Sequence, residues 1–407
     1  NDQSQITSGP IQAGAAIVGP TVKDKVNVPK LVTSYSEYLA NFGSTFTFSG
    51  SEYSFLTSIS AYNYFQNGGS SLIVTRVASG SFSPAIASVP TASTFGGTET
   101  VVFELETLSD GVIMNSTSSE SSTGALESGS ADNLRWEIVN PNTSSGTFGL
   151  IIRRGDDTTK TKRVLETFTN LSLDPKASNF ISRIVGDQTQ TLMGSGTDVY
   201  LQPTGSYRNA SRYVRVSAVN VTTPDYFDNS GNAKTAFTGS IPTAQSGTFG
   251  GATGVVMSGN NTLYENIGDA LTQGVSSSDY TDAFNLLANK DEFRYNIISA
   301  PGLIYTNGTH ATPLNTLISN VENRGDAIIP LDLENYASSI TATVSTAASL
   351  DTSYAAAYWP WLQITDPDTR QLVWVPASTL IPGVYAANDN TAEPWFAPAG
   401  INRGGLR

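Results

Sequence analysis

The sequence contains no cysteine and only one histidine among its 407 residues. Without cysteine the chain forms no disulfide, no cysteine-ligated zinc or iron–sulfur site, and no thiol nucleophile. The single imidazole, His310, cannot supply the two or three histidines of the common catalytic zinc sites, and we expect it in a loop. These absences exclude several classes of metalloenzyme and all thiol enzymes.

Charge is also scarce, because charged residues make up 14% of the chain, against roughly 25% in ordinary soluble domains. The formal net charge is −13, and the most basic stretch, residues 153–163, mixes both signs. A binder of nucleic acid or of anionic lipid needs clustered Lys and Arg. No apolar run approaches the roughly 18 residues of a membrane span. We therefore expect neither nucleic acid nor a membrane span.

Motifs for chemistry are missing as well. The sequence has no G-x-S-x-G nucleophile elbow and no P-loop, and the glycines of residues 247–254 are typical of a turn. Two pairs of acids, Asp156 with Asp157 and Asp366 with Asp368, fall in predicted turns where carboxylates are ordinarily solvated. We therefore predict a protein that is not an enzyme and that holds no cofactor and no metal.

Aromatic residues gather near the C-terminal end of the chain. Two interpretations fit them: a platform for sugar rings, or the packed core of a strand pair, which cross-strand aromatic packing favours. The residues are Tyr354, Tyr358, Trp359, Trp361 and Trp374.

The first eighty residues carry strong α/β signals. An apolar strand is predicted at residues 15–19, and a helix at 34–43 begins with a capping box of Ser34 and Glu37. A second helix is predicted at 52–69, with an apolar face of Phe55, Ile59, Tyr62 and Phe65, followed by a strand at 71–77.

The middle of the chain changes to short alternating runs separated by Gly, Ser, Thr and Asn, which predicts strands with one helix at residues 175–187. The predicted strands are 100–108, 133–139, 147–155 and 213–221. Similar glycine-containing stretches beginning at Pro90 and Pro242 bracket this part, and we interpret them as matching strand ends.

The α/β pattern returns after residue 278. The predicted elements are helices at 279–289 and 311–325, the latter with Thr312 as N-cap and Gly325 as C-cap, and strands at 295–302, 327–333, 353–364 and 371–376. The fold class predicted is mixed α/β (α+β). A discontinuous α/β domain would be built from both chain ends, residues 1–80 and 275–407, with a β-rich outer domain of residues 81–274 inserted between them.

Several stretches together resemble one family, the contractile tail sheath proteins of myophages. Residues 15–43 resemble its opening strand, G-P passage and first helix, although Asp24 stands where the family often has glycine. Residues 61–77 resemble its "F-F-x-N-G-G" helix-to-strand segment, and residues 286–303 its strand ending in "A-P-G". Residues 353–406 resemble its paired strands, its small-residue helix and its "W-x-A-P-A-G-x-N-R-G" ending.

The resemblance implies a structural subunit that polymerises helically around a tail tube and contracts to drive the tube through the host envelope for genome delivery. It implies a virion location after synthesis in the host cytoplasm, with other sheath subunits, the tube and the baseplate as partners. It also implies that the N-terminal arm and the tube-proximal C-terminal domain are missing, as in a protease-resistant fragment. Such a fragment is expected to be monomeric.

The family's ending also implies a role for the last residues. Trp395, Phe396 and Pro398 are expected to pack on the α/β domain, with disorder after Gly400. The residues assigned to assembly or to the link with the missing domain are Trp395, Pro398, Asn402, Arg403, Gly404 and Gly405.

A second hypothesis comes from a different class of protein. An acidic chain rich in Ser, Thr and Asn, with clustered aromatics, also fits a surface carbohydrate-binding protein or a glycosidase, which would need two carboxylates facing a cleft.

Overall fold

One mixed sheet joins strands from the two ends of the chain. A computed structural model describes residues 11–48, 50–91, 100–117, 119–256, 266–392 and 395–405. The sheet order is β20-β2-β6-β3, with β2 parallel to β6 and β20 and with β3 antiparallel to β6. β21 continues the sheet beside β20 through a bridge between Ile297 and Ile328, and β22 pairs with β21. The strands are β2 (Ala15–Gly19), β3 (Lys30–Val32), β6 (Leu72–Arg76), β20 (Ile297–Ser299), β21 (Ile329–Leu331) and β22 (Ala355–Ala357).

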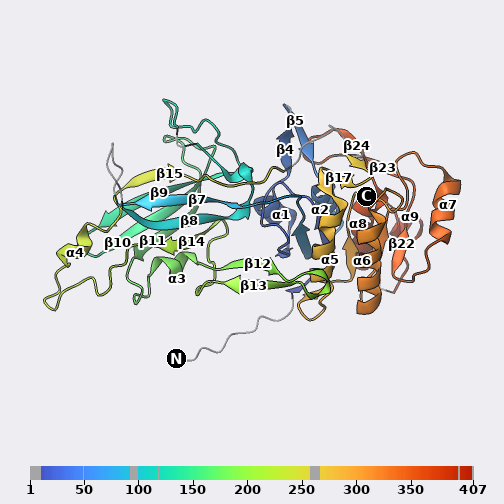
Figure 1. Ribbon diagram of the computed structural model, residues 1–407. Helices are drawn as coiled ribbons and strands as arrows, with labels where there is room; N and C mark the ends of the chain where they lie inside the picture. The colour runs from blue at the N-terminus through green and yellow to red at the C-terminus, as the bar shows by residue number, and fades with distance from the viewer. Residues whose placement is uncertain are drawn as a thin grey trace.

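Helices bury both faces of this sheet (Figure 1). Successive side chains of a strand point to opposite faces, so Ala16 and Val18 of β2 pack on one side while Ala15 and Ile17 pack on the other. The first side is covered by α5 (Tyr280–Leu287) and α6 (Ala311–Arg324). The second is covered by α1 (Tyr35–Phe42), α2 (Leu56–Gln66) and α8 (Ile381–Thr391). We call this assembly the terminal core.

The ends of α1 follow the predicted signals. Ser34 is the N-cap, its side chain accepts the backbone N–H of Glu37 at 3.2 Å, and Gly43 closes the helix with φ 72°. Glu37 in turn accepts the N–H of Thr33 at 2.8 Å. The sequence therefore predicts this helix to within a residue or two.

The prediction for α2 is wrong at its start and in its buried face. The helix begins at Leu56, because the preceding residues form β5 (Ser51–Ser54), which pairs with β4 (Thr45–Phe48). Burial extends almost around the helix and includes Ser58, Ser60 and Tyr64. One face of α2 packs on the sheet and another on a second cluster around Trp361 and Val375, so no single apolar stripe marks it.

The middle of the chain forms two antiparallel sheets that share a hydrophobic cluster, which we call the central core. One sheet has the order β14-β8-β7 and the other β11-β10-β9-β15, and the rings of Phe103 and Phe148 stack between them at 5.8 Å. The helix α3 (Ile181–Val185) packs on the same cluster. The strands are β7 (Pro84–Pro90), β8 (Val101–Asp110), β9 (Leu134–Asn142), β10 (Thr147–Arg154), β11 (Val164–Ser172), β14 (Val214–Val219) and β15 (Gln245–Thr248).

The fold class is thus mixed α and β, as the sequence predicts. The predicted echo at Pro90 falls largely on residues 92–99, which lie outside the described residues. Several helices and strands have no counterpart in the predictions. Among those already described they are β3, β4, β7 and β15. The others are β1 (Ile11–Gln12), β12 (Thr189–Met193), β13 (Tyr200–Thr204), α4 (Thr235–Thr238), β16 (Ile267–Gly268), β17 (Leu271–Thr272), β18 (Val275–Ser276), β19 (Phe293–Arg294), α7 (Ile340–Ala348) and α9 (Gly400–Arg403).

Candidate functional site

The first acid pair is held by arginine side chains. Asp157 is 1% exposed and lies between two buried arginines, with Arg153 Nε at 2.6 Å and Arg135 Nη1 at 3.1 Å from its carboxylate. Asp156 receives two hydrogen bonds from the Arg154 guanidinium at 2.6 Å. The expectation that both acids are solvated is wrong for Asp157, because two guanidinium groups replace its water.

The second acid pair closes the turn between β23 (Leu362–Thr365) and β24 (Leu372–Val375). Asp366 is 1% exposed and accepts the backbone N–H of Asp368 at 2.9 Å, so it too is not solvated. Asp368 accepts the Tyr35 hydroxyl at 3.1 Å, and burial raises the pKa of Asp368. These acids tie the turn to α1.

His310 is fully buried and occupies the N-cap position of α6 without a side-chain capping hydrogen bond, whereas the sequence predicts a loop histidine and an N-cap at Thr312. Its Nδ1 accepts the backbone N–H of Ile304 at 3.2 Å, which requires a neutral ring with the proton on Nε2. Burial lowers the pKa of His310. The one imidazole of the chain therefore serves the packing of a helix start.

A further acid is buried where β21 meets the helical turn η4 (Ala377–Thr379). Asp332 is 4% exposed and accepts hydrogen bonds from the Ser378 hydroxyl and, at 3.0 Å, from the Ser378 backbone N–H. Burial raises the pKa of Asp332 to about 7. The sequence analysis missed this residue, since an isolated acid after an apolar strand carries no distinctive signal.

Among the described residues, no group of three or more His, Asp or Glu side chains is placed to hold a metal ion. The described helices include none that is both long and apolar enough to cross a membrane.

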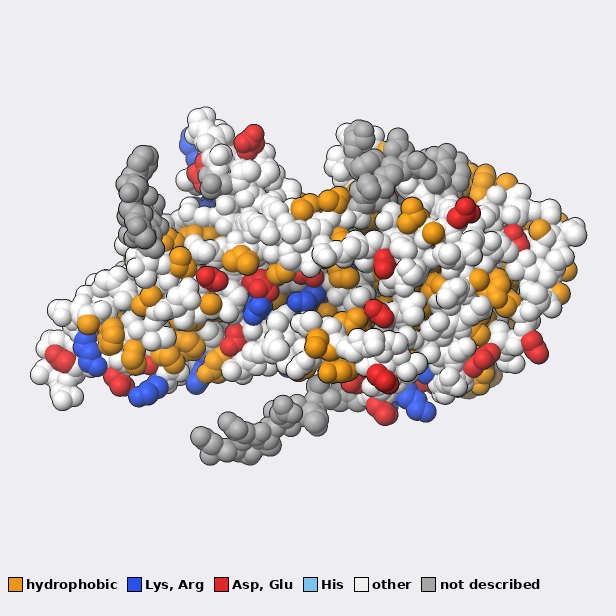
Figure 2. All heavy atoms as spheres, in the orientation of Figure 1, with side chains coloured by type: hydrophobic (Ala, Val, Ile, Leu, Met, Phe, Trp, Pro, Cys, Tyr) orange, Lys and Arg blue, Asp and Glu red, His pale blue; other side chains and the backbone are white. Residues whose placement is uncertain are grey.

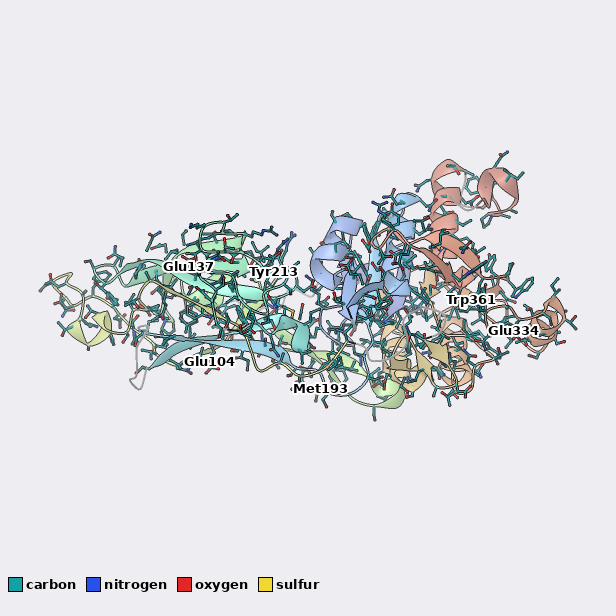
Figure 3. The ribbon with its side chains drawn as sticks, turned by 90° about the horizontal axis from the view of Figure 1, so that it is seen from above. Glu104, Glu137, Met193, Tyr213, Glu334 and Trp361 are labelled. Atoms are coloured by element: carbon teal, nitrogen blue, oxygen red, sulfur yellow. The ribbon has the colours of Figure 1, made fainter. Side chains whose placement is uncertain are left out.

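The aromatic residues do not form one platform. Tyr336, which the sequence analysis did not include, contacts the rings of Trp361 and Trp374 at 5.8 and 5.1 Å. Trp361 is 7% exposed, and its indole N–H donates to the carbonyl of Glu334 at 3.0 Å (Figure 3). Tyr354 instead packs against the terminal core. The predicted pairing of the two β runs holds for β23 with β24.

The C-terminal residues assigned to assembly lie beyond α8. Trp395 is 77% exposed and Phe396 46%, so the expected packing of these rings on the α/β domain is wrong. Helix α9 forms where disorder after Gly400 was expected, and Gly404 donates its N–H to the Gly400 carbonyl at 2.8 Å.

The contacts of this segment are local. The Arg403 guanidinium lies 4.8 Å from the centre of the Phe396 ring, and Asn388 of α8 donates to the Phe396 carbonyl at 2.9 Å. Pro398, Arg403, Gly404 and Gly405 are half-buried, whereas Asn402 is exposed. The segment is thus anchored by its backbone while its large apolar side chains face outward.

A buried arginine joins the two cores. Arg76, at the end of β6, is 1% exposed and donates to the backbone carbonyls of Asp24 on the terminal side and Asp110 on the central side, the latter at 2.9 Å. The Asp110 carboxylate accepts the N–H of Val26 at 3.2 Å, and burial raises the pKa of Asp110. Phe82 covers the guanidinium at 4.9 Å. Of these residues only Asp24 was singled out from the sequence, as a position where the resembled family often has glycine.

Asp24 also shows why glycine would suit this junction. Its φ is 90°, in the left-handed region that disfavours a side chain, and its carboxylate is held by Lys30 Nζ at 2.7 Å. The departure from glycine at this position is therefore compensated by an ion pair. The sequence signal for this junction was therefore the aspartate at position 24, where the resembled family often has glycine.

A cleft of about 320 Å³ lies between α1 and the central core, beside this junction. It is lined by Lys23 and Lys30 from the terminal side and by Asp132, Arg154 and Arg212 from the central side. Lys23 and Asp132 form an ion pair across it at 3.3 Å. Figure 2 shows blue and red side chains together in the hollow at the middle of the molecule. Lys23, Lys30 and Arg154 are each paired with a carboxylate, that of Asp132, Asp24 and Asp156 respectively.

Comparisons with known proteins give two results. No family model matches the chain, and no curated protein matches it. Solved structures similar to it include a sheath tail protein from Listeria innocua, at 8% identity and a TM-score of 0.45, and one from Desulfitobacterium hafniense, at 10% identity and a TM-score of 0.38. Each alignment covers 94% of this chain, which spans 57% and 61% of the lengths of those two proteins.

Proposed function

We propose that this chain is a subunit of a contractile phage tail sheath and has no enzymatic activity. The observation that supports it is the order of the family-like segments along the sequence, together with the way the fold uses them. The first such segments supply β2, α1, α2 and β6, and the last supply β23, β24 and α8. These distant segments contribute to adjoining clusters of the terminal core.

Two domains follow from this proposal. Residues 1–80 and 275–407 would form the α/β sheath domain nearer the tube, and residues 81–274 the outer domain. The separate hydrophobic clusters of the two cores support this division. Two parts of residues 81–274 pack with the terminal side instead, namely Ile267 and the side chains of Leu192, Val199 and Leu201.

The C-terminal residues would lead toward a tube-proximal domain. Trp395 and Ile401, which is 92% exposed, are large apolar side chains left uncovered in the described residues. Trp395, Pro398, Asn402, Arg403, Gly404 and Gly405 would then form the assembly link, and the natural gene product would carry an N-terminal arm and a further C-terminal domain.

In the proposed mechanism, subunits made in the host cytoplasm assemble helically around the tail tube of the virion, in contact with the baseplate. The assembly is open and heterologous, and it is held kinetically in an extended packing. A rigid-body change of interfaces shortens it and drives the tube through the envelope. The energy is stored in assembly, so no nucleotide is required.

Electron microscopy of the full-length gene product tests the proposal. We expect rigid hollow tubes from the full-length protein and, in sedimentation, monomers from the 407-residue chain. Soluble monomers of the full-length protein that bind or cleave glycans would overturn it in favour of the carbohydrate-binding alternative. Stable rings formed by the 407-residue chain would contradict the assignment of assembly to the flanking parts.

A further inference from the structure

One hairpin of the central stretch reaches over to the terminal core. Strands β12 and β13 pair only with each other in the described sheets, and the side chains of Leu192, Val199 and Leu201 pack against the terminal core. In Figure 1 the hairpin extends from beneath the central sheets toward α5. Figure 3 places Met193 between the two cores.

The base of this hairpin is fixed to the central core, because Arg215 of β14 donates from Nη1 to the Asp187 carbonyl at 3.2 Å and the Val216 N–H donates to the Gly186 carbonyl at 2.8 Å. The two legs of the base are also tied to each other. Asn209 exchanges two hydrogen bonds with the backbone of Gln188, at 3.0 and 2.7 Å, and Asp187 accepts the N–H of Tyr207 at 2.6 Å. Gly205 has φ 102°, and a Cβ there would meet the Asp187 carbonyl oxygen at 2.6 Å. Because the two backbone segments at its base are closely packed and hydrogen-bonded, we expect the hairpin to move together with the central core.

The tip is held much more lightly. Asn285 of α5 donates to the Gly196 carbonyl of the connecting loop at 2.8 Å. The other hydrogen bond to the terminal core lies at the base of the hairpin, where Lys25 Nζ donates to the Thr189 hydroxyl at 2.7 Å. The three inward apolar side chains are only partly buried. Nearly all other residues of the two strands are exposed, Tyr200 by 50%. An isolated two-stranded hairpin is marginally stable in water, so this arm depends on its docking.

We propose that the β12–β13 hairpin is a reversible strap that fixes the orientation of the central core on the terminal core. When it is docked, the connections between the two cores include the strap, the Arg76 junction, the ion pair of Lys23 with Asp132, and the packing of Ile113 against Val22, Phe46 and Phe55. When it is released, the buried Arg76 junction remains as the pivot and the cleft beside α1 changes its width. The strap rests on the contacts of this chain and does not depend on the sheath assignment.

Pulsed electron–electron distance measurements test this directly, because the cysteine-free chain accepts spin labels only where cysteine is introduced. Labels at Ser195→Cys and Ser319→Cys, both exposed, report docking of the tip on α6. A second pair, Ser36→Cys and Thr167→Cys, reports the separation of α1 and β11 across the cleft. Far-UV circular dichroism checks the fold of each variant.

We expect the first pair to show a dominant short distance and a minor long one. The double substitution Val199→Ser and Leu201→Ser should raise the long population roughly tenfold, since it removes the inward apolar contacts, and the second pair should change with it. Tyr200→Ser, on the outward face of the same hairpin, is the matched control and should leave both distributions unchanged. If the double variant misfolds, Asn285→Ala provides a milder release.

A folded release variant that keeps one short distance overturns the strap. Release at the tip without any change across the cleft overturns its control of orientation.

Discussion

The two cores solve the same problem of burial in different ways. In the terminal core every residue of β2 and β6 is buried, because helices cover both faces of a largely parallel sheet. In the central core β7 alternates between buried and exposed residues, because each sheet has one face against the other and one face in water. A short uniformly apolar run and an alternating run are thus both strands, and the difference between them indicates which kind of layer they join.

The cores also differ in how they hold buried charge. Asp157 of the central core lies between Arg135 and Arg153, so its charge is matched at close range. In the terminal core Asp332 is held by the hydroxyl and the N–H of Ser378, and its pKa rises. From this contrast we expect removal of a buried charge to lower the stability of the central core, and a change of pH to alter the stability of the terminal core.

The largest effect is expected from Asp157→Ala. The substitution removes the buried carboxylate that Arg135 and Arg153 share and leaves each guanidinium with one carboxylate, that of Glu120 or Glu137. The free energy of unfolding should therefore fall by about 3 kcal/mol, the lower end of the range for a broken buried pair. Trp136 is the only tryptophan of residues 81–274, and its fluorescence during denaturant unfolding reports the central core.

The matched control is Asp156→Ala, whose partners Arg154 and Arg163 are partly exposed. It should cost no more than about 1 kcal/mol. Equal losses for the two variants would contradict the assignment of Asp157 as the ion that holds the central core.

The next effect concerns Asp332. Its folded pKa of about 7 lies above the ordinary 3.8, so the folded state binds a proton more readily than the unfolded state. The contribution of this group therefore stabilises the fold as pH falls from about 7 toward 4, by at most about 1.4 kcal/mol per pH unit.

Asp332→Asn removes this contribution. Measured by denaturation at each pH, the variant should be more stable relative to the parent chain at pH 8 than at pH 5. Parallel stability curves for the two proteins would show that Asp332 titrates normally.

His310 should act with the opposite sign. Its pKa is lowered by burial, so the unfolded chain binds the proton first, and this contribution is lost as pH falls below about 6.5. Because the chain has one histidine, its ring signals in the NMR spectrum are unambiguous. We expect their titration midpoint below 6.5, and a midpoint at or above 6.5 would refute the neutral, acceptor role of Nδ1.

The smallest effect is expected at the cap of α1. Ser34→Ala removes the side-chain acceptor of the Glu37 N–H and should cost about 1 kcal/mol. The control is Ser36→Ala, at the second residue of α1, which should change the free energy of unfolding by much less. A loss at Ser36 as large as that at Ser34 would mean that capping does not explain the helix start.

The sequence predicts elements whose signals are local. The cap and the closing glycine of α1 and the apolar run of β2 need only neighbouring residues, and their predictions are confirmed. The face of α2 is mispredicted because a second side of the helix packs, through Leu56 and Ile59, with Ile267, Ile304 and Trp361, which lie more than two hundred positions away.

The junction shows the same limit more strongly. Arg76 ends an ordinary strand, and its role depends on carbonyls of Asp24 and Asp110 that only the tertiary fold brings together. The strap is exposed on most of its surface, so neither of its strands shows a periodic apolar pattern that would identify it. The packing predicted for Trp395 and Phe396 is wrong, because an aromatic pair flanked by prolines has the same local sequence whether its rings are buried or exposed.

The most direct test of the account is cryo-electron microscopy of intact tails that contain the full-length protein, in extended and contracted forms. We predict helical density around a tube in which the terminal core lies nearer the axis, the central core lies outward, and the segment from Trp395 to Gly405 continues into further density. A tail in which this chain has no place in the wall around the tube, or in which the central core faces the tube, would contradict it.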